Sequence, residues 1–217
     1  MQQIIQILIY IHAFFGGLGL ISGTISMVLK KGGVNHKKAG KLFSLSMLIS
    51  SLLSLIIASM PQHENTFLFL IGVFTIYMVL AGNRALTFKN TAKTRANFID
   101  KTISGSMLIA SLTMVVLGTF GWIQHIQNSL LYVFFGAFGL LLTTSDFRTF
   151  KNFRNNNNAW LKSHLARMIG ALIASFTAFL VAGLNISTLL VWMMPTVIGT
   201  AYILYWNRKL SSYQKLI

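Results

Sequence analysis

Long apolar segments alternate with short polar segments along the whole chain. Seven of the apolar segments approach or exceed the roughly 20 residues that a helix needs to cross the hydrocarbon core of a bilayer. We therefore predict seven membrane-spanning helices, over residues 4–29, 42–60, 67–86, 102–124, 130–147, 165–184 and 188–207. No polar segment is long enough for a soluble domain, so residues 1–217 are predicted to form one all-α transmembrane bundle.

The boundary between the fourth and fifth segments depends on a short polar stretch. Without Gln124, His125, Gln127 and Asn128, residues 102–145 would form one apolar run of about twice the length that a single crossing needs. We therefore predict a turn at residues 125–129. A turn there also gives the odd number of spans that places all the basic clusters on one side of the membrane.

The basic residues follow a pattern that predicts orientation. All 18 Lys and Arg residues fall within four clusters, at residues 30–41, 84–101, 148–167 and 208–215. With seven spans the four clusters lie on the same side, and short basic loops are retained in the cytoplasm. The predicted topology therefore has the N-terminus outside and the C-terminus in the cytoplasm.

Composition narrows the class of protein further. Charged residues make up 10% of the chain, apolar residues 54%, and the mean hydropathy is +0.67, whereas soluble domains contain about a quarter charged residues. A net charge of +15 would suggest nucleic acid as the partner of a soluble protein. Here the charges flank membrane-length segments, so we expect no nucleic-acid partner and anionic lipid headgroups as the counter-charge. The chain has no Cys, which excludes disulfides and thiolate metal sites.

A histidine and three glycines share one face of the first predicted span. Gly16, Gly19 and Gly23 follow His12 at i+4, i+7 and i+11. Because glycines let helices approach closely, this face is predicted to point into the bundle. The imidazole either packs against a neighbouring helix through a hydrogen bond, or serves a haem, a proton or a substrate. Haem usually takes two axial ligands, and no other His lies in the middle of a predicted span.

Further polar residues lie near the basic ends of the third, fifth and sixth spans. Arg84 follows Tyr77 by seven residues on one helix face, and Asp146 lies at a similar depth in the fifth span. We predict an Asp146–Arg84 ion pair, which is either a structural bridge at the interface or a substrate or proton site. His164 opens the sixth span, where a helix N-terminus attracts anions.

Two local patterns complete the picture. Asp100, just before the fourth span, is predicted to pair with Lys101. Similar sequences recur at residues 46–52, 106–112 and 170–176. They are consistent with three helical hairpins plus a seventh helix, with two parallel three-helix units joined by the fourth span, or with chance similarity in a small membrane alphabet.

Several short motifs are spread over most of the chain. They are His12 with its glycine face, His36-Lys37-x-x-Gly40-Lys41, Gly82-Asn83-Arg84, His164 to Gly170, Thr177-Ala178-Phe179 and Trp192-x-x-Pro195-Thr196. Together these motifs resemble a family of bacterial multi-pass membrane proteins to which no function is assigned. The resemblance implies a helical bundle in the bacterial inner membrane. It supplies no substrate.

The favoured hypothesis is a transporter-like or small-ligand-binding bundle with a polar site near the cytoplasmic face. The residues predicted to line that site are His12, Tyr77, Arg84, Asp146 and His164. Neither a catalytic residue nor a metal site is predicted, and motifs of the common intramembrane hydrolases are absent. Two alternatives remain, which are a haem-linked redox protein that uses His12 and a structural subunit whose basic face docks a cytosolic protein. The pattern indicates no oligomeric state.

Overall fold

The computed structural model describes residues 2–90, 93, 95–152, 158–184, 186 and 188–214. Within these residues the chain is helical and contains no strand, which confirms the predicted all-α class. The long helices are α1 (Gln2–Val28), α2 (Val34–Ile57), α3 (Thr66–Ala85), α4 (Phe98–Ile123), α5 (Ser129–Asn152), α6 (Ala159–Ala178) and α7 (Leu189–Gln214). A 3₁₀ turn, η1 (Leu86–Lys89), extends α3, and a π-helical turn, η3 (Phe179–Gly183), extends α6.

The turn between α4 and α5 forms where the polar residues predicted it. α4 ends at Ile123 and α5 begins at Ser129. His125 and Asn128 have φ angles of 56° and 64°, in the left-handed region that few residues other than glycine adopt. Two left-handed residues therefore reverse the chain here, and the predicted break of the apolar run is confirmed.

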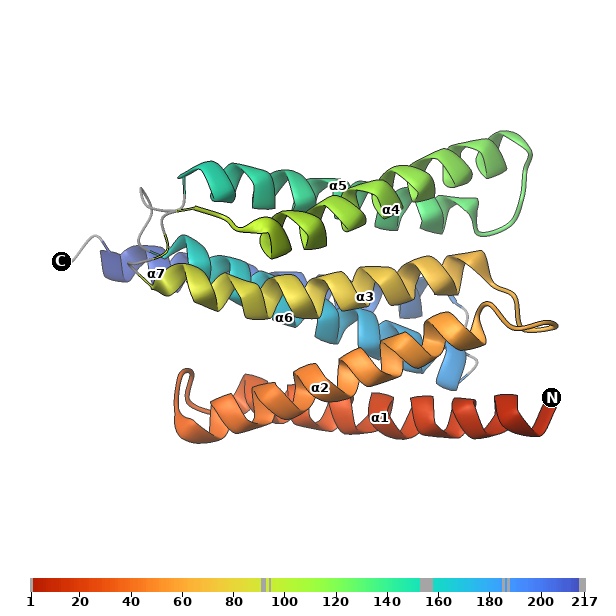
Figure 1. Cartoon of the computed structure of the whole chain (residues 1–217), viewed down its shortest axis with the longest axis horizontal. Coiled ribbons are helices and arrows are strands. Elements are labelled where there is room, and N and C mark those ends of the chain that lie inside the picture. The colour runs from red at the N-terminus through yellow and green to blue at the C-terminus, as the bar shows by residue number, and fades with distance from the viewer. Residues whose placement is uncertain are drawn as a thin grey trace.

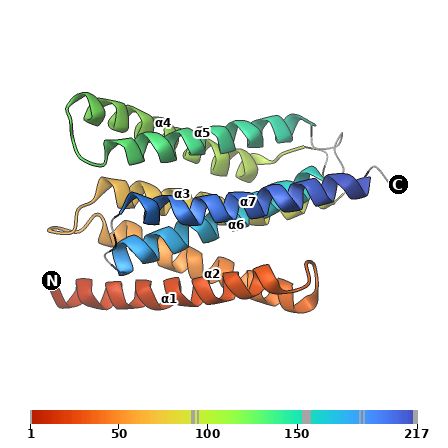
Figure 2. The ribbon, with the colours of Figure 1, turned by 180° about the vertical axis from the view of Figure 1, so that it is seen from behind.

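Successive helices run in alternating directions, so the connections gather at two opposite ends (Figure 1). We call one of these the basic end. It is formed by the α1–α2, α3–α4 and α5–α6 connections and by the C-terminal part of α7. The described residues of all four basic clusters belong to this end, while the opposite end has no Lys or Arg among its described residues. The N-terminus lies at that opposite end (Figures 1 and 2).

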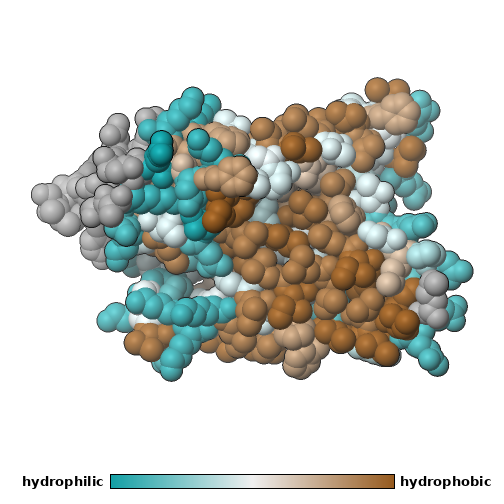
Figure 3. All heavy atoms as spheres, in the orientation of Figure 1, coloured by the Kyte–Doolittle hydropathy of each residue, from teal (hydrophilic) through white to brown (hydrophobic). Residues whose placement is uncertain are grey.

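Six helices are long and apolar enough to cross a membrane, namely α1 to α6. On the face seen in Figure 3, a broad hydrophobic band covers the middle of the molecule and hydrophilic residues collect at both ends. The protein therefore has the make-up of a multi-pass membrane protein. α7 is not among the six. It is a helix of 26 residues that runs alongside α6. The structure therefore confirms a helix over the seventh predicted span, but not that this helix crosses a membrane.

The helices form three layers, with α3, α6 and α7 between the α1–α2 pair and the α4–α5 pair (Figure 1). Large side chains from α2, α3, α4 and α6 meet in the interior. This core includes Phe43, Met47, Phe74, Met107 and Leu172. The hairpin of α4 and α5 is thus an outer layer that packs on the central helices.

The glycine face of α1 points into the bundle as predicted. A methyl group added at Gly19 would lie 2.6 Å from the sulfur of Met47, and one at Gly23 would lie 2.8 Å from Leu172 and from Phe43. α1 can therefore approach α2 and α6 closely only because these positions lack a side chain.

We expect Gly136→Ala to destabilise the α4–α5 hairpin by about 1–3 kcal/mol, because the added methyl overpacks a tight contact. That methyl would lie 2.9 Å from both the Ser111 carbonyl oxygen and the Val115 amide nitrogen, and backbone atoms cannot rotate away. Gly105→Ala in α4 is the control, since nothing lies within 4 Å of its added methyl. Unfolding in detergent measures both variants, and equal stability would contradict the expected contact.

Candidate functional site

A buried carboxylate joins four helices near the basic end. Asp146 on α5 accepts hydrogen bonds from Tyr77 Oη of α3 at 2.6 Å and from Ser104 Oγ of α4 at 2.9 Å. Arg167 of α6 donates to the other carboxylate oxygen at 2.5 Å. Each of these four residues is no more than 5% exposed. We call Tyr77, Ser104, Asp146 and Arg167 the Asp146 network.

Arg167 makes further contacts that offset part of the free-energy cost of burying its charge. The nitrogen that bonds Asp146 also donates to the Leu142 carbonyl of α5 at 2.8 Å, and the guanidinium lies 5.8 Å from the centre of the Tyr77 ring. A buried ion pair is stable only when hydrogen bonds satisfy most of its remaining groups. Arg167 Nε is nevertheless buried without a partner in the described part of the chain. The network is therefore nearly, but not fully, satisfied.

The predicted Asp146–Arg84 pair is wrong. Arg84 Nε instead donates to Asp100 at 2.7 Å, and Asp146 pairs with Arg167. The reason is depth, because Arg84 lies at the end of α3, about 10 Å along the axis from Tyr77. Tyr77 is the α3 residue level with Asp146, whereas Arg84 is level with the start of α4.

The predicted pair of Asp100 with Lys101 is also wrong. Asp100 binds Lys93 at 2.7 Å in addition to Arg84, and its carboxylate accepts the Asn97 backbone N–H at 3.0 Å. The Asn97 side chain in turn accepts the Asp100 N–H at 3.0 Å, which forms a capping box at the start of α4. The cap turns the carboxylate back toward the loop and α3. We call Arg84, Lys93, Asn97 and Asp100 the Asp100 cluster.

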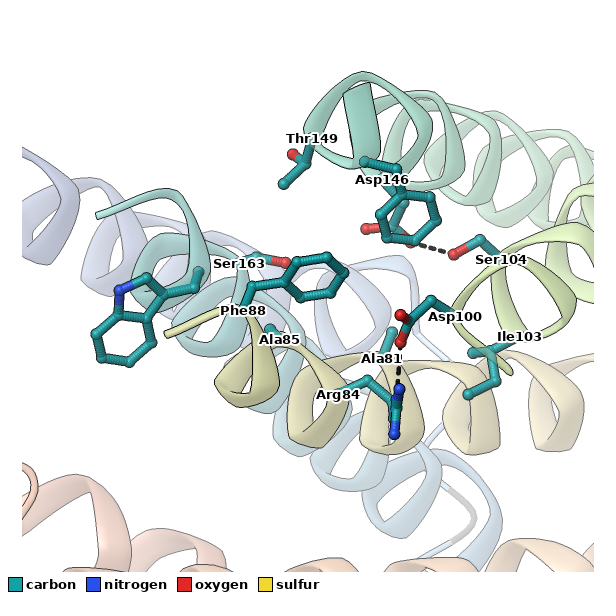
Figure 4. A pocket seen from close by; sticks show the side chains of 12 residues that line it. Ala81, Arg84, Ala85, Phe88, Asp100, Ile103, Ser104, Asp146, Thr149 and Ser163 are labelled. Carbon is teal, nitrogen blue, oxygen red and sulfur yellow. Dashed lines mark hydrogen bonds and ion pairs between the residues drawn. The ribbon is translucent and has the colours of Figure 1, made fainter. Parts of the chain in front are cut away.

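A small cavity at the basic end connects these two groups of residues (Figure 4). Its volume of about 20 Å³ accommodates about one water molecule. Aromatic rings from η1, α5 and α6 form part of its wall. Its polar lining comes from Arg84, Asp100, Ser104, Asp146, Thr149 and Ser163. Both acidic residues of the basic end thus line one water-sized space.

The two predicted histidines lie away from this cavity. The ring of His164 donates from Nδ1 to the Gly82 carbonyl at 2.8 Å, and its neighbour Ser163, rather than His164, lines the cavity. The His12 ring donates to the Ser50 carbonyl of α2 at 2.9 Å, and Ser50 Oγ donates to the His12 carbonyl at 3.1 Å. Both histidines tie neighbouring helices together, and for His12 this is the packing role that the sequence left open.

Of the residues predicted to line one site, the structure brings Tyr77 into contact with Asp146 and places Arg84 at the same cavity as Asp146. Sequence reasoning missed Ser104 and Arg167. The predicted sixth span begins at residue 165, which places Arg167 among the flanking basic residues. In the structure α6 begins at Ala159, so Arg167 lies in its third turn, where a charge needs a partner. No comparable signal marks Ser104, because several serines lie on the buried faces of α2 and α4.

The fold and the Asp146 network together define a helical bundle that is compatible with a multi-pass membrane protein and that has an ion pair buried between its helices. The described residues contain no group of three or more His, Asp or Glu side chains that could hold a metal ion. No family model, curated protein or solved structure matches the chain. The resemblance to bacterial membrane proteins, the haem-linked alternative and the subunit alternative therefore stay predictions.

Proposed function

We propose that the protein is a transporter-like membrane protein that binds a small polar solute between α3, α4, α5 and α6. The observation that carries this proposal is the Asp146 network, a buried ion pair beside a cavity at the basic end. Ionisable residues inside membrane helices are costly, and they commonly mark substrate, ion or proton pathways. Ser104, Thr149 and Ser163 add hydroxyl groups that could bind a solute next to the carboxylate.

The orientation and location form part of the proposal. The distribution of Lys and Arg supports a basic end in the cytoplasm, with the N-terminus outside and α7 as the seventh span. The resemblance of the sequence motifs supports the bacterial inner membrane. The solute would then enter or leave the cavity on the cytoplasmic side.

The charges around the cavity favour a small zwitterion, such as a free amino acid. Asp100 and Asp146 offer negative groups, and Arg84 lines the same space with a positive group. Both carboxylates are already paired with basic side chains. A zwitterion can pair its positive group with the carboxylate and its negative group with the basic side chain, which leaves no net charge buried. A simple anion or cation can satisfy only one of the two.

Binding of a solute requires the α4–α5 hairpin to move, because the present cavity holds only about one water. Tyr77 and Arg167 belong to the central helices, and Asp146 belongs to the hairpin. If the bonds from Tyr77 and Arg167 to Asp146 were exchanged for bonds to the solute, the hairpin would be released. The solute would thereby favour one arrangement of the bundle over another, as alternating access requires.

A thermal-shift experiment on purified protein in detergent tests this function with three panels: free amino acids, simple carboxylic acids and simple amines. We expect the amino-acid panel alone to contain a stabilising compound. The shift should disappear in the double variant Asp146→Asn/Arg167→Gln, which removes both charges of the pair together. It should persist in Glu64→Gln, which removes the one acid outside the basic end.

Two outcomes would contradict the proposal. Stabilisation that survives in the double variant would place the binding site elsewhere. A wild-type protein that responds to none of the three panels would leave the Asp146 network as a structural connection between helices.

A further inference from the structure

Half of the residues that line the cavity at the Asp146 network are apolar, and three of these are aromatic. Phe88 of η1 and Phe150 of α5 stack on each other, with their ring centres 5.8 Å apart and their planes 14° from parallel. Trp160, in the first turn of α6, lines the same cavity. The α4–α5 hairpin is therefore joined to the central helices by a pair of rings as well as by the Asp146–Arg167 ion pair.

Further contacts hold the two stacked rings in place. Lys93 Nζ lies 3.6 Å from the centre of the Phe88 ring and also binds Asp100 at 2.7 Å, so it links this ring to the Asp100 cluster. On α5, Phe147 meets the Phe150 ring edge-on, with 5.8 Å between the ring centres. Each ring is thus fixed by a neighbour other than its stacking partner. Groups that are preorganised in this way bind a ligand at a lower entropic cost.

The ring contact and the charged groups lie one helical turn apart on both sides of the cavity. On α5, Phe150 follows Asp146 by four residues, which puts both side chains on one face at a spacing of about 6 Å. On the opposite side, Phe88 follows Arg84, another residue of the cavity wall, by four residues. Figure 4 shows Phe88 and Asp146 projecting toward the space between α3 and α5. Each side of the cavity therefore presents a charged group beside a ring.

On the basis of the solute-binding function proposed above, we propose that the solute is an aromatic amino acid. Its charged groups replace the Asp146–Arg167 pair, and its ring inserts between Phe88 and Phe150. Movement of the hairpin breaks both of these contacts together. A zwitterion with a polar side chain would restore the ionic contacts and leave the two ring faces in water, which costs free energy in proportion to the apolar area. An aromatic side chain restores both contacts, because rings stack favourably at centre distances of about 4.5–7 Å.

Thermal-shift titration of purified protein in detergent tests the side chain of the solute. The probes are the three aromatic amino acids, serine, and phenethyl alcohol, which carries a ring but neither charge. We expect at least one aromatic amino acid to stabilise the protein. Serine should bind roughly tenfold to a hundredfold more weakly, because it buries no ring. Phenethyl alcohol should have no effect, because it cannot replace the ion pair.

Two variants test the stacked rings from opposite sides of the cavity. Phe150→Leu keeps an apolar side chain on α5 but removes its ring, and should lower the apparent affinity for the aromatic amino acid about two- to tenfold. Phe88→Leu removes the other ring of the stack and should cause a similar loss. Circular dichroism checks that both variants remain folded, and either variant alone is sufficient to test the stacking.

The matched control is Phe138→Leu, which removes a ring at 37% exposure from the same helix, about three turns from Phe150. It should bind the aromatic amino acid like the wild type. An equal loss in Phe138→Leu and Phe150→Leu, or no loss in Phe150→Leu and Phe88→Leu, would overturn the stacking site.

The probes separate this inference from the function on which it rests. Serine as effective as the aromatic amino acids would overturn the aromatic side chain and leave the proposed function standing. Phenethyl alcohol as effective as the aromatic amino acids would show that the ring binds without the charges, and would overturn an amino acid as the solute. A protein that responds to no amino acid would overturn both proposals.

Discussion

Arg167→Gln is expected to destabilise the folded protein by about 3–5 kcal/mol, which is the range for breaking a buried ion pair by removing one partner. The substitution leaves Asp146 at 5% exposure, and its remaining side-chain partners among the described residues are the hydroxyls of Tyr77 and Ser104. It also removes the bond from Arg167 to the Leu142 carbonyl of α5. The free energy of unfolding in detergent and the yield of folded protein measure the effect.

Two further variants separate the loss of an ion pair from a general loss of charge. Asp146→Asn/Arg167→Gln removes both charges, and should recover most of the stability because no buried charge is left without a partner. Arg84→Gln should cost no more than about 1 kcal/mol, because its side chain is 28% exposed and Lys93 still pairs with Asp100. An Arg84 variant as unstable as the Arg167 variant would contradict this assignment.

The apolar pattern predicted the helices but not where they end. The second span was predicted over 42–60, whereas α2 covers Val34–Ile57 and begins before Lys37 and Lys38. Hydropathy reports the part of a helix that suits hydrocarbon, while the helix itself continues into the interface, where charged side chains are tolerated. α6 likewise begins at Ala159 rather than at residue 165. The break between α4 and α5 was predictable because polar residues there coincide with a turn.

The sequence predicted which helix faces contribute to the site, but not which basic residue pairs with Asp146. Asp146 is an ionisable residue inside a predicted span, so a bonded partner is expected, and the sequence analysis places Arg84 at a similar depth with Tyr77 on the same helix face. Arg84 and Arg167 were both within reach along the sequence. The choice between them depends on how far α3 and α6 are shifted along their axes relative to α5, and no single-helix pattern contains that shift. The capping box that turns Asp100 toward Arg84 is likewise a loop geometry.

Cysteines introduced one at a time are expected to show on which side of the membrane each connection lies. The chain contains no native Cys, so only the introduced residue can be labelled. Gln127→Cys in the α4–α5 turn should react with a membrane-impermeant maleimide on intact cells. Val34→Cys, exposed at the start of α2, should react only after the membrane is permeabilised. The reason is the positive-inside rule, since all four basic clusters lie at the end that carries Val34.

Lys209→Cys extends the same experiment to α7, whose crossing of the membrane is a proposal. If α7 spans the bilayer, position 209 lies on the side of Val34 and should be protected in intact cells. Labelling of position 209 from outside, with position 34 still protected, would mean that six helices cross and that α7 does not. Labelling of position 34 from outside would reverse the orientation, and would place the cavity at the Asp146 network on the outer face.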